Sequence, residues 1–355
     1  MKTYVEGLSA SDRLAWLSII ITLGVIGIYL ILQGPYIHVD TPSYKQMDPR
    51  RSAGYPLFLH FFRIFGDGYL YIVITVQVLL SISAVVAFLL FIGRLFQLHP
   101  FSFLFVLPII VYAALNNPFP REIMTEALAF PIFLFVVIFF FKGILNSSYQ
   151  NMSIAMLLSI LLVLVRSQFL YFFPVFFLGM LHIYLTDRNL LNLARYAALL
   201  ILLYPATQLI DKSYHYIFHG KFISSPFGSN GIAANALYVA QPNDVLLFDD
   251  DSVKNLFNSI YKVMERDTLN LVSLMESQNR NDIRVADVQH YSASFNRILH
   301  ETTTPLLQEH FHELDGIESW EAIESKLERM MLPLIKSNIE DFFRINFLYS
   351  ILTRG

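Results

Sequence analysis

The sequence predicts an all-α polytopic membrane protein with about seven transmembrane helices and a helical extracytoplasmic C-terminal domain. Of the 355 residues, 55% are hydrophobic and only 15% are charged, whereas a typical soluble domain has about 25% charged residues. Long uncharged apolar runs recur through residues 1–210. Those residues hold eight of the 28 acidic side chains, and residues 211–355 hold the other twenty. The chain therefore divides into a membrane bundle and a water-facing tail.

Each of seven apolar runs is expected to form a transmembrane helix. Crossing about 30 Å of hydrocarbon takes about 20 residues, so the shorter runs need tilt or polar flanks to span it. In chain order the runs are Leu14–Leu32, Tyr69–Gly93, Phe101–Leu115, Ala127–Phe141, Met152–Val165, Phe169–Leu185 and Ala197–Ile210.

The chain is divided into three parts by composition. Residues 1–210 form the transmembrane bundle, whose external loop 34–68 we expect to lie along the membrane surface. Residues 211–338 form the helical extracytoplasmic domain, and residues 339–355 form a terminal amphipathic helix or the start of a missing span. Positive charges divide evenly between the two sides of the bundle, so the N-terminus is assigned to the cytoplasm from the placement of the long loop and tail instead.

In the tail, apolar residues recur at helical spacing and predict helices over Ser252–Glu265, Arg284–His300 and Ile317–Ile335. The sequence Ser337-Asn338-Ile339-Glu340 has the form of a capping box that opens another helix. Ser224–Gly231 is expected to be a loop.

Several classes of function are excluded by composition. The net charge of −3 argues against a nucleic-acid partner, which would favour a basic face. The absence of cysteine excludes disulfides, thiolate metal sites and cysteine nucleophiles. The sequence has no glycine-rich phosphate loop, which disfavours a mechanism based on ATP or a nucleotide sugar.

A first candidate site lies just after the first apolar run, in the stretch His38-Val39-Asp40-Thr41-Pro42-Ser43-Tyr44, which Arg50 and Arg51 follow. An acid at the boundary between water and lipid is well placed to act as a general base. Asp before Thr-Pro is also typical of a helix cap, because its side chain can accept hydrogen bonds from free backbone N–H groups. The sequence leaves both interpretations of Asp40 open.

A second candidate site opens the fourth apolar run. Glu122 and Glu126 are four residues apart and share one helix face, with Arg121 adjacent. Glu126 borders an uninterrupted apolar run, and an ionisable group at that depth is a functional candidate because desolvation is costly. An ordinary helix N-terminus, where acids favour the helix dipole, is the alternative.

Further polar residues have two interpretations each. Arg166, between the fifth and sixth runs, marks a tight turn or a buried cation. His215 and His219 share a helix face near the membrane surface and could contact a ligand there. In the tail, His300, His310 and His312 could bind a metal together with nearby Glu residues, or they could simply lie on solvated helices. The acidic cluster Asp249–Asp251 either opens a helix or binds a cation.

Together these motifs resemble the GT-C class of membrane glycosyltransferases, and most closely the bacterial branch related to protein O-mannosyltransferases and aminoarabinose transferases. The resemblance covers about residues 1–210. It rests on Asp40-Thr-Pro-Ser-Tyr44, Arg51-Ser-Ala-Gly-Tyr-Pro-Leu-Phe-Leu59, Thr125-Glu126 and Val-Arg166-Ser-Gln. Ser52-Ala53 stands where that class usually has Pro-Pro, and Ser167 stands where Pro is common.

The resemblance implies a role for each candidate residue. Asp40 is the expected catalytic base, and Glu126 and Glu122 are expected to orient the acceptor. The sequence requires no cofactor; a divalent cation, if one is used, would be held by these three carboxylates. The expected substrate-binding residues are the phosphate clamps Arg50, Arg51 and Arg166, together with Arg121, His38, Tyr44 and Tyr55, although tyrosines at this depth also serve as membrane anchors.

The function implied is transfer of a sugar, with inversion, from a polyprenyl-phosphate donor to a hydroxyl or amine of a lipid, glycan or protein acceptor. The reaction is expected at the external face of the inner (plasma) membrane, and membrane lipids are the other partners. A transporter or flippase for a lipid-linked solute is one alternative. A non-catalytic assembly partner with the same fold is another.

Overall fold

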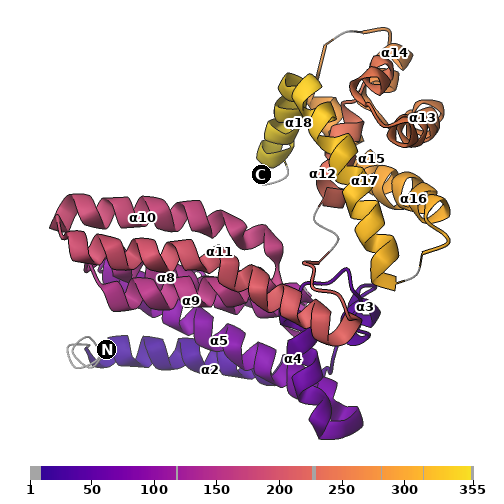
Figure 1. The fold of residues 1–355 in the computed structure, drawn as a ribbon. Helices are drawn as coiled ribbons and strands as arrows, with labels where there is room; N and C mark the ends of the chain where they lie inside the picture. Colours follow the sequence, from indigo (N-terminus) through magenta and orange to yellow (C-terminus); the bar gives the residue numbers. More distant parts are fainter. Residues whose placement is uncertain (1–8, 117–118, 226–228, 281, 315, 353–355) are drawn as a thin grey trace. The chain divides into compact units, whose positions relative to one another are not determined.

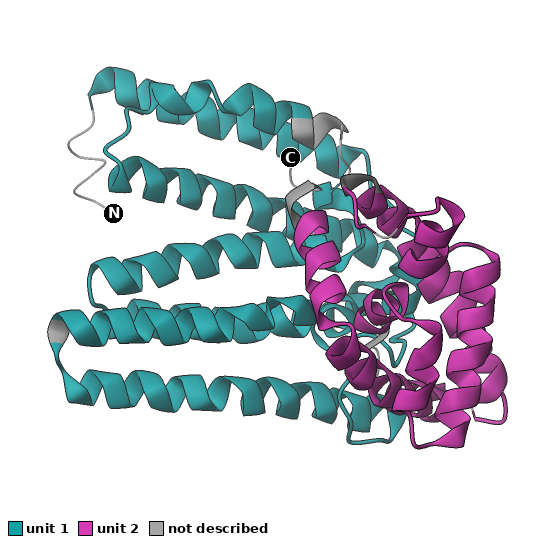
Figure 2. Ribbon diagram, turned by 90° about the horizontal axis from the view of Figure 1, so that it is seen from above, with its two compact units in different colours: residues 1–225 teal, residues 226–355 magenta. Residues whose placement is uncertain are grey.

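The chain is all-α in the part that the structure describes, apart from one isolated parallel bridge between Tyr36 and Glu122. The predicted helical class is therefore confirmed. The chain divides into two compact units, unit 1 (residues 1–225) and unit 2 (residues 226–355), which Figure 2 distinguishes by colour. The computed structural model describes residues 9–116, 119–225, 229–280, 282–314 and 316–352.

Unit 1 is a helical bundle. Its helices are α2 (Ala10–Leu32), α3 (Thr41–Lys45), α4 (Gly54–Phe62), η1 (Arg63–Gly68), α5 (Tyr69–Leu95), α6 (Phe101–Leu104), α7 (Leu107–Asn116), η2 (Phe119–Arg121), α8 (Thr125–Leu145), α9 (Tyr149–Val165), η3 (Ser167–Tyr171), α10 (Phe172–Asp187) and α11 (Leu190–His219). The long helices lie side by side and pack in the order α2, α5, α8, α9, α11, α10 (Figure 1).

Five helical segments of the described residues are long and apolar enough to cross a membrane. The third and fifth predicted runs form shorter apolar helices instead, over Phe101–Tyr112 and Tyr149–Val165. The outer face of α2 exposes Leu14, Ile21 and Val25, as suits a helix surrounded by lipid. The five segments are Ala10–Leu32, Gly54–Leu95, Thr125–Leu145, Ser167–Thr186 and Leu190–His219. The protein is therefore membrane-embedded.

Local signals set the helix ends. The Ser9 hydroxyl accepts from the backbone N–H of Asp12 at 3.1 Å, and the Asp12 carboxylate accepts from the Ser9 N–H, so a capping box satisfies these two N–H groups at the start of α2. The Asn189 side chain caps α11 by accepting from the backbone N–H groups of Leu191 and Asn192. Gly220 ends α11 with a φ of 76°, a left-handed conformation that favours glycine.

The structure adds detail to two boundaries of the bundle. Segment 34–68, which we expect to lie along the membrane surface, contains α3, α4 and η1, and α4 buries Tyr55 and Leu59 completely because one face of that short helix packs against α5 and α9. The division expected after residue 210 falls inside α11, which continues to His219 with Asp211 and His215 buried; the compact unit ends at residue 225.

Unit 2 is built around one apolar core, to which Phe257, Ile260 and Leu327 contribute fully buried side chains. Its helices are α12 (Ser229–Tyr238), η4 (Pro242–Leu247), α13 (Asp251–Arg266), α14 (Leu271–Ser277), α15 (Val285–Asn296), the π-helix η5 (Arg297–Thr303), α16 (Thr304–His310), α17 (Gly316–Ser337) and α18 (Ile339–Leu352).

The tail helices predicted around Ser252, Ile317 and Ile339 are confirmed as α13, α17 and α18. The helix predicted over Arg284–His300 changes to a π-helix at Arg297. The predicted loop Ser224–Gly231 is wrong at its end, since α12 begins at Ser229 and leads into a buried alanine-rich face; residues 226–228 lie outside the described residues, as do 353–355 of the terminal segment.

His290 of α15 makes the stability of unit 2 depend on pH. Its Nε2 lies 2.8 Å from the carbonyl oxygen of Thr268 and its Nδ1 lies 3.1 Å from the Tyr238 hydroxyl. Burial lowers the pKa of His290 below its ordinary value of 6.5, against the opposing effects of the Thr268 hydrogen bond and the Asp287 charge. Below pH 6.5 the unfolded ring binds a proton that the folded ring resists, so stability falls as the pH is lowered towards the folded pKa.

We expect His290→Gln to remove this part of the pH dependence. The free energy of unfolding of the full chain, followed by Trp320 fluorescence, should lose up to about 1.4 kcal/mol per pH unit below pH 6.5 in the wild type. The slope should be smaller in the variant. His310→Gln, on an exposed position of α16, is the matched control. Equal slopes for the wild type and His290→Gln would contradict the prediction.

Candidate functional site

The two acidic stretches predicted from the sequence meet at one end of the bundle. The backbone of Tyr36 donates to the carbonyl oxygen of Arg121 at 3.0 Å and accepts from the N–H of Ile123 at 3.1 Å. The Thr41 hydroxyl donates to the Ile123 carbonyl oxygen at 3.1 Å. The segment after α2 is therefore joined to the segment before α8, which places Asp40 and Glu126 in one region.

Arg51 is the centre of the first half of the site. Its guanidinium donates to Asp40 Oδ1 at 2.7 Å, to the Tyr44 hydroxyl at 3.2 Å and to the Ser43 hydroxyl at 2.9 Å. It also lies over the Tyr44 ring, 4.5 Å from the ring centroid. The Asp40 side chain remains 40% exposed, and its Oδ2 lies 3.9 Å from His38 Nδ1. A carboxylate held in this way still has an accessible edge for a ligand.

Asp40 occupies the N-cap position of α3, but its side chain makes no capping hydrogen bond. The carboxylate turns to Arg51 instead, because the charge-assisted hydrogen bond is stronger than one to a neutral N–H. The helix-cap interpretation of the Asp40 side chain is therefore wrong.

Tyr44 links Arg51 to the second half of the site. Its hydroxyl hydrogen bonds with Thr125, whose own hydroxyl donates to Glu126 Oε2 at 2.9 Å. The Glu126 carboxylate forms an ion pair with Arg166. We call the side chains of Asp40, Arg51, Tyr44, Thr125, Glu126 and Arg166 the polar network.

The environment of the site shifts two pKa values. Burial raises the pKa of Tyr44 despite the nearby positive charge of Arg51, so the phenol stays protonated and able to donate. Burial also raises the pKa of Glu122, which is repelled by Glu126 and stabilised as an anion by His38 and Arg121. Glu122 lies beside the polar network, and its backbone carbonyl accepts from the Gln77 side chain.

Three of the predicted substrate-binding residues point elsewhere. Arg50 forms a bidentate pair with Asp48, with N–O distances of 2.8 and 2.7 Å. Arg121 donates to the carbonyl oxygen of Gly34 at 3.2 Å and lies over the Tyr36 ring. Tyr55 is completely buried beside Tyr44, 5.1 Å between ring centroids, so it supports the site from the core and cannot stack on a substrate.

The structure also shows where the other candidate histidines and the acidic cluster lie. His215 is completely buried inside α11 rather than lying at a surface, and its ring is 5.4 Å from that of His219. Asp250 caps α13, which supports the helix-opening interpretation of the acidic cluster. His300, His310 and His312 are exposed.

Within the described ranges no group of three or more His, Cys, Asp or Glu side chains is arranged to hold a metal ion. The carboxylates of Asp40, Glu122 and Glu126, which we expected to share a cation if one is used, therefore do not form a ready ligand set. We assign no metal to them.

A small pocket opens beside the Glu126–Arg166 pair. It has a volume of about 270 Å³. Glu126, Arg166 and Gln168 provide its polar groups, and Arg166 donates to Gln168 at 3.0 Å. The rest of its lining is Ala129 and the aromatic rings of Phe119, Phe130, Phe133, Phe169 and Tyr171. A few polar groups against apolar rings are typical of a small-molecule site.

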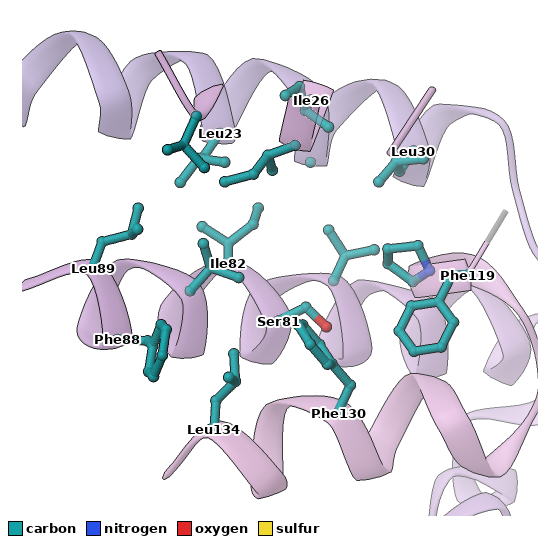
Figure 3. A pocket seen from close by; sticks show the side chains of 16 residues that line it. Leu23, Ile26, Leu30, Ser81, Ile82, Phe88, Leu89, Phe119, Phe130 and Leu134 are labelled. Atoms are coloured by element: carbon teal, nitrogen blue, oxygen red, sulfur yellow. The ribbon is translucent and has the colours of Figure 1, made fainter. Parts of the chain in front are cut away.

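A larger cavity of about 500 Å³ lies next to that pocket, between α2, α5, α7 and α8. Figure 3 shows Leu23 and Leu30 of α2 pointing into it across from Ile82 of α5. Among the described residues that line it, Ser81 alone has a polar side chain, and its hydroxyl has no hydrogen-bond partner among them. Such a cavity is suited to hydrocarbon and not to water.

The two cavities share a wall. Phe119 and Phe130 line both of them, and their rings pack edge to face with 5.7 Å between centroids. A polar pocket with a carboxylate and an arginine thus adjoins an apolar cavity. The arrangement matches an amphiphile, with its polar head at Arg166 and its apolar chain between the helices.

Sequence reasoning missed the residues that connect the site. Thr41 joins the two backbone segments, and Gln77, completely buried in α5, donates to the Glu122 carbonyl oxygen at 3.1 Å. Asp211 in α11 was counted only as an acid of the tail. A polar or acidic residue that interrupts an apolar helix is the signal that could have identified Gln77 and Asp211.

Comparisons of the chain with protein-family models, with curated proteins and with solved structures find no match.

Proposed function

We propose that the protein is a membrane glycosyltransferase that moves a sugar from a polyprenyl-phosphate donor to an acceptor hydroxyl or amine. One observation supports this above the others: the polar network joins the acid after the first span, the Thr-Glu pair that opens α8 and the arginine after α9. These are the residues on which the resemblance to GT-C glycosyltransferases rests. They lie far apart in the sequence and converge in the fold.

The chemistry that we propose needs a base and cations. The acceptor oxygen forms a bond to the anomeric carbon of the sugar while its proton passes to the Asp40 carboxylate. The bond between that carbon and the phosphate oxygen breaks, and its electron pair stays on the leaving polyprenyl phosphate. Arg51 and Arg166 stabilise the phosphate negative charge, and Glu126 orients the acceptor. A single displacement inverts the anomeric centre.

The apolar cavity supports a lipid-linked donor. Burying a hydrocarbon chain contributes about 0.8 kcal/mol per methylene, so a cavity adjoining the polar pocket would supply much of the donor affinity. The polar groups lie at one end of the bundle. A transporter for the same solute would favour a binding site midway along the bundle instead.

We further propose that α7 and α9 complete seven spans, with the N-terminus in the cytoplasm. Unit 2 would then be extracytoplasmic, and the membrane would be the bacterial inner membrane. Labelling of single cysteines with a membrane-impermeant maleimide tests this topology directly, because the natural chain has no cysteine.

The experiment that tests the function uses the full-length protein in lipid nanodiscs. It is supplied with a panel of polyprenyl-phosphate sugars, and release of polyprenyl phosphate is measured, with empty nanodiscs as the control. Release that depends on the protein supports the proposal. If no donor is consumed and the protein instead moves donor across the bilayer of a vesicle, the transporter is correct; if neither occurs, the assembly partner is.

Filling the apolar cavity should weaken donor binding. We expect Val85→Trp to raise the KM for the donor about tenfold, since loss of roughly two buried methylenes corresponds to that factor. Leu79→Trp, on the exposed face of the same helix, is the matched control and should leave KM unchanged. Equal KM values for the two variants would exclude the cavity as the donor site.

A further inference from the structure

Asp211 is a buried residue inside a candidate membrane span, and its carboxyl group accepts hydrogen bonds from two backbone N–H groups. Its Oδ1 accepts from the N–H of Ala53 at 2.9 Å, and its Oδ2 accepts from the N–H of Ser225 at 2.9 Å. The residue is only 7% exposed. An ionisable group buried in an apolar helix is costly and is a candidate for a function. Here the carboxyl group holds two chain segments against α11.

One of those segments carries Arg51. Ala53 is completely buried and lies two residues after Arg51. On the other side, the Ser225 hydroxyl donates to the carbonyl oxygen of Arg50 at 2.6 Å. The backbone on both sides of Arg51 is therefore tied to the end of α11, directly through Asp211 and indirectly through Ser225.

A second contact presses the same segment against α9. A Cβ atom on Gly54 would lie 2.6 Å from the backbone carbon of Leu164. Leu164 is two residues before Arg166, which pairs with Glu126. The segment that carries Arg51 is thus held between α11 and the end of α9. The same contacts therefore fix the position of Arg51 relative to Arg166.

We propose that Asp211 is a positioning residue that acts through Arg51. It fixes the backbone from Arg50 to Ala53 so that the Arg51 guanidinium meets Asp40 and Tyr44 and presents a preformed charge to the donor phosphate. This inference rests on the proposed function of the polar network. A carboxylate is needed because its two oxygens accept from two N–H groups at once, whereas an asparagine would direct an N–H₂ group at one of them.

A double-mutant cycle tests this inference. The wild type, Asp211→Asn, Arg51→Ala and the double variant are compared in nanodiscs by the KM for a polyprenyl-phosphate sugar, by kcat and by the midpoint of thermal unfolding. We expect Asp211→Asn to raise KM about tenfold, and to have no further effect on KM once Arg51 is alanine, because a residue that acts only through Arg51 cannot add to its loss.

The matched control is Asp244→Asn in unit 2. Asp244 is also buried and accepts from the backbone of Gln241 and from the Asn338 side chain, so its loss lowers stability without touching Arg51. Its KM should stay at the wild-type value. If Asp211→Asn raises KM equally with and without Arg51, or leaves KM unchanged, the inference is overturned.

Failure of the proposed function gives a different result. If the wild type consumes no donor, the glycosyltransferase proposal is overturned. The positioning role of Asp211 is then still open to test. The same cycle is then measured as binding of polyprenyl phosphate alone. A tenfold weaker affinity in Asp211→Asn that disappears in the Arg51→Ala background supports the inference, and an unchanged affinity overturns it. Because Asp211→Asn keeps one acceptor oxygen, it is used in place of alanine to preserve the fold.

Discussion

Asp40→Asn is expected to lower sugar transfer by about 10²- to 10⁴-fold, the usual contribution of a general base. The amide cannot take the proton of the acceptor hydroxyl. Its oxygen can still accept from Arg51, whose guanidinium lies 2.7 Å from Asp40 Oδ1, so the ion pair is replaced by a hydrogen bond and the local structure is retained. The loss should therefore fall on kcat, while the KM for the donor changes little.

The measurement is the rate of polyprenyl phosphate release in nanodiscs, together with the midpoint of thermal unfolding. Asp67→Asn is the matched control, since Asp67 is an exposed acid of the same segment, residues 34–68, and lies outside the polar network. It should behave as the wild type does. Undiminished transfer by Asp40→Asn would mean that another group is the base, and Glu126→Gln would be examined next.

Gly54→Ala is expected to destabilise the bundle and to impair the site together. The added methyl group would lie 2.6 Å from the carbonyl carbon of Leu164 and 2.7 Å from both the Leu164 oxygen and the Val165 nitrogen. These are backbone atoms, which cannot rotate away, so α4 and α9 must separate. Overpacking of this kind costs about 1–3 kcal/mol.

The expected consequence for function follows from the position of Gly54 between Arg51 and the end of α9. Separation of the two helices would move Arg51 away from Arg166 and raise the KM for the donor. Gly24→Ala is the matched control, because a Cβ atom on Gly24 meets nothing within 4 Å. If the unfolding midpoints of the two variants are equal, the close approach at Gly54 is not a constraint on the fold.

The class of the protein can be predicted from the sequence because it depends on composition and periodicity. A long uncharged apolar run has few alternatives to a helix in lipid, since every backbone polar group must be satisfied within the segment. The runs around Ile19, Ile74 and Leu134 are helical as predicted. The tail helix at Ser252 was equally predictable, because its apolar positions recur at helical spacing and Asp250 provides a cap.

The candidate site could be predicted only in part. The chemistry of Asp40, Arg51, Glu126 and Arg166 was evident from residue types at the ends of apolar runs, and these residues do converge. Their neighbours Arg50 and Tyr55 looked equally suitable, but one pairs with Asp48 and the other is completely buried. A one-residue step along a helix or turn changes which way a side chain points, and sequence spacing does not resolve that near a helix end.

Residue types and their periodicity therefore predict a helical membrane protein with acids and arginines at the ends of its spans, because burial of apolar surface and satisfaction of the backbone are local requirements. Which of those charges pair depends on the packing of helices distant in the sequence. Tyr44 reaches Thr125, and Asp211 reaches Ala53, only because α3, α8, α9 and α11 meet at one end of the bundle. Such contacts between distant segments are a property of the packed fold, and no local pattern encodes them.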